Sequence, residues 1–361
     1  MATKRIGILT SGGDCPGLNA VIRGAVYAAS KRNWEIIGFT DGYEGILSPV
    51  RYRVLDESST SGIMHLGGTI LGTTNRGRFV AKKMHGEKAK LDPSIIEEAK
   101  ETLEGLGIEG LICIGGDGSL TTANELFENG IPTIGVPKTI DNDLRATAVT
   151  FGFDSAVACV VDSLDRLHTT ARSHKRVMVL EVMGRYAGWI ALHGGLAGGA
   201  DIILIPEIPF EFEALSKFID ERETHGSTST MVVVAEGACP KDGTYVSKSM
   251  DQKGEARLGG IGEQVAEYIA DSTGKDTRSV VLGHLQRGGN PTALDRILGT
   301  RFGVAAVDLL AEGKYGSMVS YQNYLVGDVP MADAIRSIRL VEPDNQIVTT
   351  CREVGIHFGD E

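Results

Sequence analysis

The sequence repeats one pattern along most of its length: a short apolar run, a glycine-rich turn, and a segment with apolar side chains at helical spacing. The first example is IGIL, then TSGGDCPG, then a segment whose Leu18, Val21, Ile22 and Ala25 share a helix face. Further helices are expected near 94–106 and 155–167, from Arg185, and over 294–310. Because neighbouring parallel strands need crossover connections, this alternation indicates an α/β fold with mostly parallel sheets.

The length of 361 residues suggests one large or two medium domains. We expect two three-layer α/β domains, with the active site in the cleft between them. The first should comprise 1–150 and about 286–335, and the second 151–285 and about 336–361. In such sheets ligands bind beyond the carboxyl ends of the strands. The turns that follow strands are therefore the candidate binding sites.

Charge and cysteine content narrow the class of protein. The formal net charge is −11, which argues against a nucleic-acid partner because phosphate backbones need clustered Lys and Arg. The beginning of the chain lacks the apolar core of a signal peptide, and no stretch approaches ~18 apolar residues. The five cysteines show no CxxC pair and are typical of reduced thiols: Cys15, Cys113, Cys159, Cys239 and Cys351. We therefore expect a cytosolic protein that does not associate with membranes.

Two glycine-rich turns, TSGGDCPG and GGDGS, each follow a strand and open a helix. Adjacent glycines let backbone N–H groups approach an anion, and a helix N-terminus favours negative charge. Such a glycine pair can also serve only the sterics of the turn. Asp117 adds a carboxylate where phosphates would lie, which suits a Mg²⁺ ligand, although aspartate there is also a plain helix N-cap. The P-loop motif and the dinucleotide fingerprint are missing.

The stretch PKTIDND, 137–143, places a lysine and two aspartates after another apolar run. Asp-Asn-Asp is a common polar turn, but beside a phosphate-binding turn a carboxylate suits a general base that accepts a hydroxyl proton. Basic side chains also gather near strand ends. Each alone fits a solvated surface charge, whereas together they indicate a receptor for a phosphorylated ligand. They are His174, Lys175, Arg176, Arg185, Arg278, His284 and Arg287.

Five ordered motifs resemble those of the 6-phosphofructokinase family: LTSGGDCPGLNAVIRG, IGGDGS, TIDND, EVMGRYAG and LGHLQRGG. The likeness extends to about Asn323, and the tail from Tyr324 is less informative. The resemblance implies a magnesium-dependent transfer of a phosphoryl group to O1 of fructose 6-phosphate, giving fructose 1,6-bisphosphate, the committed step of glycolysis. It also implies a homo-oligomer, a dimer or a tetramer.

The resemblance carries roles onto individual residues. Gly13, Gly118 and Ser119 would bind the donor phosphates, and Asp117 would hold Mg²⁺. Asp141 would be the general base, supported by Thr139, Asp143 and Arg185. The sugar phosphate would be held by Thr139, Ile140, Asp141, Met183, Gly184, Arg185, Glu236, His284, Leu285, Gln286 and Arg287. Arg176 and Arg278 would reach this site from a neighbouring subunit.

The chain departs from the family's pattern at its effector site and its bridging arginine. Tyr27 and His168 stand where the bacterial allosteric pattern has arginines, and the usual basic cluster before MVVVAEG is THGSTS here. These changes count against the familiar site for ADP and phosphoenolpyruvate. In TTNRGRF, Arg76 is the candidate that would bridge donor and sugar, with Arg78 as the alternative.

The phosphoryl donor is the third departure. Gly118 is the residue of ATP-dependent members, whereas Lys138 is the residue of pyrophosphate-dependent members, so the chain is similar to the mixed-substrate group. Because aspartate at 118 would crowd and repel an α-phosphate, we expect ATP as the donor. Pyrophosphate or ADP remains the alternative. A catalytically silent sugar-phosphate sensor would need neither Asp117 nor Asp141.

Overall fold

The computed structural model describes residues 4–74, 76–79, 90–243, 247–250 and 256–361. The chain divides into two compact units, each with its own parallel sheet. Unit 1 comprises Met1–Thr139, Leu144–Ser155 and Arg287–Ile338, and unit 2 comprises Ile140–Asp143, Ala156–Gln286 and Arg339–Glu361. The donor and sugar roles expected of the two domains, and the cleft expected between them, stay predictions.

The described part of unit 1 contains an eight-stranded sheet in the order β14-β13-β5-β4-β1-β2-β3, with β6 paired to β5. The pairs inside the sheet are parallel, and the edge pairs β2–β3 and β13–β14 are antiparallel. The inner strands are almost continuously apolar because helices cover both faces. The strands are β1 (Arg5–Thr10), β2 (Glu35–Phe39), β3 (Tyr52–Leu55), β4 (Ile108–Gly115), β5 (Thr133–Thr139), β6 (Phe151–Gly152), β13 (Ser317–Gln322) and β14 (Leu325–Pro330).

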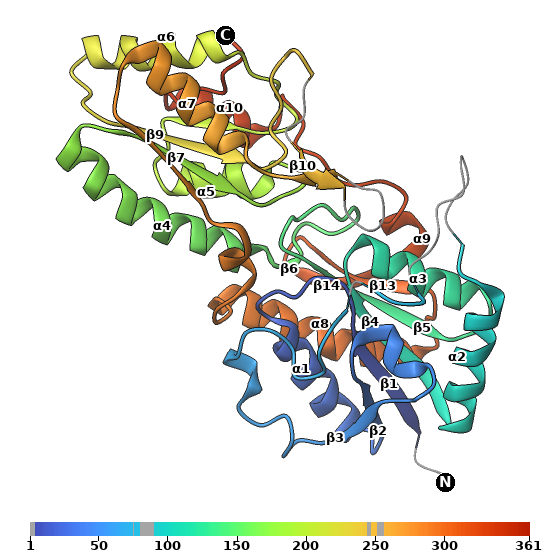
Figure 1. Ribbon diagram of the computed structural model, residues 1–361. Coiled ribbons are helices and arrows are strands. Elements are labelled where there is room, and N and C mark those ends of the chain that lie inside the picture. The colour runs from blue at the N-terminus through green and yellow to red at the C-terminus, as the bar shows by residue number, and fades with distance from the viewer. Residues whose placement is uncertain (1–3, 75, 80–89, 244–246, 251–255) are drawn as a thin grey trace. The chain divides into compact units, whose positions relative to one another are not determined.

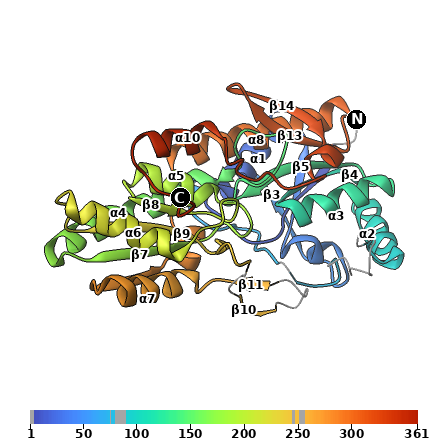
Figure 2. The same ribbon diagram turned by 90° about the horizontal axis from the view of Figure 1, so that it is seen from above.

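The helices of unit 1 form layers on the two faces of its sheet. Figures 1 and 2 show α1 (Leu18–Ser30) and α8 (Ala293–Glu312) side by side on one face, with α2 (Pro93–Gly105) and α3 (Asp117–Glu128) on the other. A short helix, α9 (Met331–Ala334), follows β14. The predicted helices near 94–106 and over 294–310 are confirmed within a few residues. Asp92 begins α2 as an N-cap, because its side chain accepts from the N–H of Ser94.

Glycine allows α1 and α8 to approach closely. A Cβ on Gly24 would lie 2.5 Å from the carbonyl oxygen of Thr300, and one on Gly303 would lie 2.1 Å from that of Val21. Both distances are shorter than any side chain tolerates, and the atoms it would meet are backbone. The two helices therefore pack backbone against backbone. This packing holds α1, and with it the glycine-rich turn that leads into α1.

The main sheet of unit 2 is parallel throughout, in the order β12-β7-β9-β8. Its strands are β7 (Val177–Val182), β8 (Ile202–Leu204), β9 (Thr230–Ala235) and β12 (Thr277–Val281). The helices α6 (Phe212–Thr224) and α7 (Ile261–Thr273) pack on one face through a shared apolar core. Unit 2 also contains the antiparallel pair of β10 (Ser247–Met250) and β11 (Ala256–Leu258) and the late helix α10 (Gln346–Glu353). The predicted α/β class with mostly parallel sheets is thus confirmed.

Two helices of this region differ from expectation. The helix predicted near 155–167 is longer, because α4 runs from Phe153 to His174 and begins in unit 1. The helix expected from Arg185 is wrong at its start, since α5 (Trp189–Ala197) begins four residues later. Arg185 has φ 51° and Gly184 has φ 145°, and neither conformation continues into a right-handed helix. These residues instead form an open loop after β7.

A buried carboxylate, that of Asp295 in the first turn of α8, holds the start of α4. Its oxygens accept from the N–H groups of Gly152 and Ser155, both at 2.9 Å, and from the Ser155 hydroxyl at 2.6 Å. Burial raises the pKa of Asp295 from its ordinary value of 3.8 to about 6, although these hydrogen bonds oppose the change. The folded chain therefore holds this proton at pH values where the unfolded chain releases it.

This difference predicts the pH dependence of stability. The contribution of Asp295 is full below about pH 4 and is lost as the pH rises through about 6, a change of about 3 kcal/mol in the free energy of unfolding. Asp295→Asn should remove that slope, so the wild-type advantage over the variant should shrink by this amount between pH 4 and pH 7. Urea unfolding at several pH values measures it. Asp165→Asn, at an exposed position of α4, is the control. A pH-independent difference for Asp295→Asn would contradict the prediction.

Candidate active site

The two glycine-rich turns of unit 1 lie together, because they follow neighbouring parallel strands. Thr10 at the end of β1 pairs in register with Ile114 in β4, and the N–H of Ser11 donates to the carbonyl of Ile114 at 2.9 Å. A Cβ on Gly12 would lie 3.3 Å from the hydroxyl oxygen of Ser119. The turns that carry Gly13 and Ser119 therefore lie side by side, and the helix N-terminus at the second turn suits an anion.

Asp117 is the first residue of α3 and its side chain is exposed. The N-cap position belongs to Gly116, which has no side chain to cap with. The plain N-cap reading of Asp117 is therefore wrong, since this residue is the first of the helix itself. An exposed carboxylate beside an anion-binding turn fits Mg²⁺, which takes one or two carboxylates and completes its shell with phosphate oxygens and water. The described residues hold no group of three or more His, Cys, Asp or Glu side chains that could bind a metal.

Gly118 is not required by packing. A Cβ at this position would meet no atom within 4 Å, and its φ does not fall in the left-handed region that favours glycine. The absence of a side chain at 118 therefore leaves space for a ligand without serving the fold. This geometry is what a role in donor selection requires.

Lys138 is buried at the end of β5, and its ammonium contacts the first turn. Its Nζ donates to the carbonyl oxygen of Gly13 and lies 3.6 Å from where a Cβ of Gly12 would be. Arg287 approaches the same turn from the other side, donating from Nη1 to the carbonyl of Asp14 at 3.2 Å. Both cations thus border the Gly13 turn, and in the free chain Lys138 fastens that turn to β5.

The two arginines of TTNRGRF have different surroundings. Arg78 forms ion pairs, from Nη1 to Glu98 at 3.0 Å and from Nε to Glu44 at 3.9 Å. The backbone N–H of Arg76 donates to the hydroxyl of Thr74 at 3.1 Å, and Arg76 is exposed. Among the described residues no ion pair forms at the Arg76 guanidinium. Arg76 is therefore the better placed of the two to meet a ligand.

In unit 2, two neighbouring parallel strands bring Glu236 to the loop that carries Arg185. Val182 at the end of β7 pairs with Ala235 at the end of β9, and the N–H of Glu236 donates to the Val182 carbonyl at 2.8 Å. The N–H of Arg185 in turn donates to Oε1 of Glu236 at 3.1 Å. A Cβ on Gly237 would lie 2.0 Å from the Arg185 carbonyl oxygen, so the loops touch through backbone. Met183 and Gly184 lie in the same loop.

Asp141 lies in the buried loop Ile140–Asp143, where Asn142 adopts a left-handed conformation with φ 53°. Burial raises the pKa of Glu236, the N–H of Arg185 opposes this, and the negative charges of Asp141 and Glu181 raise it further. Asp141 and Glu236 are thus electrostatic neighbours inside unit 2. Thr139 ends β5 just before this loop, and its carbonyl accepts from the Thr150 hydroxyl at 2.8 Å.

The loops of Asp141, Arg185 and Glu236 are here called the loop cluster. Arg176 and Arg278 lie at the opposite edge of the unit 2 sheet from this cluster. Both precede or begin a strand, whereas Arg185 and Glu236 follow the carboxyl ends of their strands. Both guanidinium groups pair with Asp276, and Nη1 of Arg278 lies 2.5 Å from Oδ1 of this residue. The structure therefore does not gather all the predicted basic residues of unit 2 into one site.

The turn after β12 is a short 3₁₀ helix, η3 (Gly283–Arg287). His284 and Leu285 are exposed on it. Gln286 is fully buried, and its Nε2 donates to the Gly283 carbonyl at 3.2 Å. The predicted contact from Gln286 to a substrate would therefore need its backbone, since its side chain shapes the turn.

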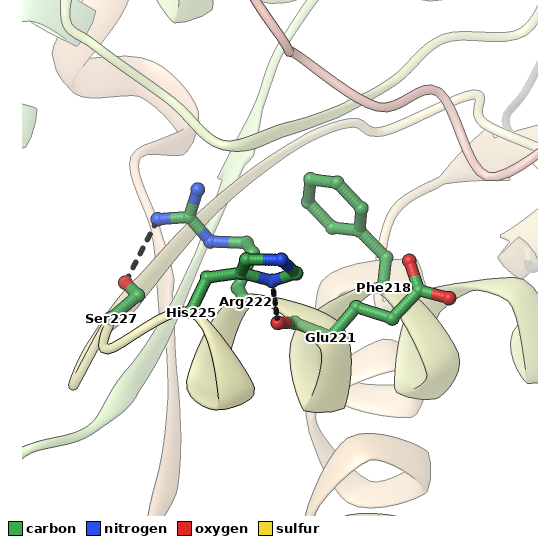
Figure 3. Close-up of a pocket in the computed structure, with 5 residues that line it drawn as sticks. All are labelled: Phe218, Glu221, Arg222, His225 and Ser227. Carbon is green, nitrogen blue, oxygen red and sulfur yellow. Dashed lines mark hydrogen bonds between the residues drawn. The ribbon is translucent and has the colours of Figure 1, made fainter.

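A separate pocket of about 350 Å³ lies at the carboxyl end of α6. Figure 3 shows its lining side chains, which are Phe218, Glu221, Arg222, His225 and Ser227. The Arg222 Nη2 contacts Oδ1 of Asp201 at 2.7 Å and donates to the Ser227 hydroxyl at 3.1 Å. Because Asp201 offsets this charge, the pocket suits a polyanion poorly, which agrees with the altered THGSTS segment. None of the predicted site residues lines it.

Two contacts of the loop cluster were not predicted. Glu207 follows the apolar run IILIP, a signal visible in the sequence, and its carboxylate accepts from the N–H of Gly188 at 2.9 Å. Arg339 lies far along the chain, yet its N–H donates to the Asp143 carbonyl at 2.7 Å. Nothing near Arg339 in the sequence points to this contact.

Comparison with known proteins agrees with this arrangement. The family model described as Phosphofructokinase matches residues 5–310. The chain is 52% identical to an ATP-dependent 6-phosphofructokinase of Chloroflexus aggregans over 100% of both chains. It is 47% identical to a pyrophosphate–fructose 6-phosphate 1-phosphotransferase of Streptomyces coelicolor, over 98% of this chain and 100% of that one.

A crystal structure of Pichia pastoris phosphofructokinase in the T-state superposes with a TM-score of 0.81 at 31% identity. The alignment covers 93% of this chain, which spans 36% of the Pichia chain. The family model and the relatives that match along the full length lead to one conclusion: this chain belongs to the phosphofructokinase family.

Proposed function

We propose that this chain is an ATP-dependent 6-phosphofructokinase that transfers the γ-phosphoryl group of ATP to O1 of fructose 6-phosphate. The observation that carries the proposal is the contrast between two carboxylates. Asp117 is exposed at a helix N-terminus beside an anion-binding turn, whereas Asp141 is buried beside Glu236. Two carboxylates in such different settings suit two roles, a metal ligand and a general base.

In unit 1 the donor would be held by backbone and by cations. N–H groups of the Gly13 turn and of the first turn of α3 would bind its phosphates, with Ser119 beside them and Arg76 reaching the transferred group. Asp117 would hold Mg²⁺, which neutralises charge on the phosphate oxygens. Phosphoryl transfer involves little covalent chemistry by the protein, so positioning and charge stabilisation are the main tasks of these residues.

In unit 2 the sugar would be activated by Asp141. Its carboxylate would accept the proton of the 1-hydroxyl as that oxygen forms its bond to phosphorus and the bond to the ADP oxygen breaks. Arg185 would stabilise the charge that develops, and Thr139 and Asp143, which flank Asp141 in the sequence, would support the base. Glu236, whose pKa is raised by burial, would accept hydrogen bonds from sugar hydroxyls together with the loop of Met183 and Gly184.

The 6-phosphate would be bound by cations and donors from the turn after β12. His284 and Arg287 lie on η3, and Leu285 and Gln286 would contribute through the backbone of this turn. Arg176 and Arg278 would complete the site from a neighbouring copy of the chain. Their place at the other edge of the unit 2 sheet supports this sharing, because it separates them from their own loop cluster. The enzyme would accordingly work as a homo-oligomer, in the cytosol.

The donor is proposed to be ATP on the basis of positions 118 and 138. Gly118 leaves open space beside the phosphate-binding turn, and Lys138 is engaged by the Gly13 carbonyl, which gives it a structural task. Relatives with each donor in their names are similarly close, at 52% for ATP and 47% for pyrophosphate. Pyrophosphate is therefore the second candidate.

Removing the base should slow turnover strongly. Asp141→Asn keeps the shape of the side chain but cannot accept the hydroxyl proton, so kcat should fall by about 10²-fold or more. Fructose 6-phosphate should still bind, as measured by calorimetry with the non-turning-over variant. Near-normal kcat in a coupled assay would sink the assignment of Asp141 as the base.

The identity of the phosphoryl donor can be tested by placing a negative charge at position 118. Gly118→Asp should lower kcat/KM for ATP by about 10²-fold, because its carboxylate would repel the α-phosphate, and the fold should tolerate it. Gly118→Asn has nearly the same size without the charge and is the matched control. The wild type should use ATP and not pyrophosphate at equal concentration. Fast turnover with pyrophosphate and none with ATP would overturn the proposed donor.

Sharing of sites between copies is tested by mixing two inactive variants. Asp141→Asn lacks its own base, and Arg278→Ala lacks the donated arginine. After refolding together, a subunit with an intact base can receive an intact Arg278 from its Asp141→Asn neighbour, so part of the activity should return. Refolding each variant alone is the control. If the mixture stays as inactive as its parts, Arg278 does not act in a neighbour's site.

A further inference from the structure

A late segment of the chain, Arg339–Val341, contacts the loop of Asp141 directly and is connected to the loop of Arg185 through Glu207, and all the residues involved belong to unit 2. The N–H of Arg339 donates to the carbonyl of Asp143 at 2.7 Å, at the end of the loop that carries Asp141. The N–H of Val341 donates to Oε1 of Glu207 at 2.9 Å. This segment, here called the strap, therefore connects the base loop to Glu207.

Glu207 continues the connection to the loop of Arg185. Its two carboxylate oxygens lie 2.9 and 3.1 Å from the N–H of Gly188, which precedes α5 and ends the loop after β7. Burial raises the pKa of Glu207, while the N–H groups of Val341 and Gly188 favour the charged form. One half-buried carboxylate thus joins the strap and the start of α5.

The side chain of Arg339 fixes the strap onto α5. Its guanidinium carbon lies 4.5 Å from the centroid of the Trp189 ring, and its carbonyl accepts from the indole Nε1–H at 3.0 Å. Trp189 is the first residue of α5 and is buried. Arg339 thus contacts the indole at two points, with its guanidinium over the ring and its backbone carbonyl accepting the indole N–H. This pair of contacts leaves the Arg339 backbone little freedom.

Arg339 is half-buried where it packs against α5. Burial lowers its pKa from the ordinary value, and burial together with the charge of Arg339 lowers the pKa of His193 one turn further along α5. The rings of Trp189 and His193 lie 6.1 Å apart. The half-buried guanidinium thus packs against the first turn of α5.

We propose that Arg339 and Trp189 are positioning residues that fix the Asp141 loop against the Arg185 loop through the strap. The inference rests on the proposed function, since it assigns these residues an effect on the proposed base. General-base catalysis depends on placement, and a displacement of about 1 Å can cost about 10²-fold in rate. The contacts of Arg339 with Asp143 and Trp189 are the ones that would prevent such a displacement.

The first test is Arg339→Ala compared with Arg352→Ala. Arg352 is a matched control, because its guanidinium lies 4.9 Å from the Phe358 ring in the same part of unit 2 but does not contact either loop. Arg339→Ala should lower kcat about 10-fold while KM for ATP stays within about twofold, and Arg352→Ala should keep both values. Arg339→Lys should recover part of kcat because it returns a cation to the ring. A wild-type kcat for Arg339→Ala, or an equal loss in Arg352→Ala, would overturn the proposal.

Trp189→Phe provides a milder variant in case Arg339→Ala does not fold. It keeps an aromatic ring but loses the N–H that reaches the Arg339 carbonyl, so kcat should fall less than in Arg339→Ala. Thermal unfolding should place its Tm near that of Arg352→Ala. A loss of Tm with unchanged kcat would mean that the contact serves stability alone and would overturn the positioning role.

Combining Arg339→Ala with Asp141→Asn tells a failure of the proposal from a failure of the proposed function. If Arg339 acts through the base, the double variant should have the kcat of Asp141→Asn within about twofold. A further tenfold loss in the double variant would show that Arg339 acts independently of Asp141 and would overturn the proposal. If Asp141→Asn itself is fully active, the proposed function fails, whatever Arg339→Ala does.

Discussion

Parallel pairing of neighbouring strands is the constraint on which the candidate site depends. In unit 1 the pairing of β1 with β4 brings the Gly13 turn beside Ser119, and in unit 2 the pairing of β7 with β9 brings Glu236 beside Arg185. Parallel strands end at the same edge of a sheet, so residues distant in the sequence meet there. The glycines at these edges permit backbone contact. At Gly237, for example, a Cβ would lie only 2.0 Å from the carbonyl oxygen of Arg185.

Most of the fold and many site positions follow from local sequence, because apolar runs and glycine-rich turns are local signals. The α/β class and the turns of Gly13 and Asp117 are correctly predicted on that basis. The prediction of a helix starting at Arg185 is wrong, because Arg185 has a left-handed backbone conformation. The alternative reading of Asp117 as an N-cap is excluded as well, because Gly116 occupies the cap. The ion pairs of Arg78 and the burial of Gln286 depend on tertiary contacts, so no pattern near them reveals their role.

Electrostatic balance explains how an acidic chain can handle phosphorylated ligands. With a net charge of −11, the overall field repels anions, and binding must come from local donors. Helix N-termini and backbone N–H groups supply partial positive charge without adding a side chain, while Lys138 and Arg287 border the Gly13 turn. Elsewhere arginine charge is offset, as Asp201 offsets Arg222 and Asp276 offsets Arg176 and Arg278.

The strap includes a contact to the TIDND motif that comes from outside the part of the chain matched by the family model. The family model matches residues 5–310, and Arg339 lies beyond that range. Yet the carbonyl of Asp143, inside the TIDND motif, is held by the N–H of Arg339. The motif supplies the carboxylate of Asp141, but the orientation of its loop also depends on a residue that no motif contains. The geometry proposed for Asp141 therefore extends beyond the motif, because it includes the contact of Arg339 with this loop.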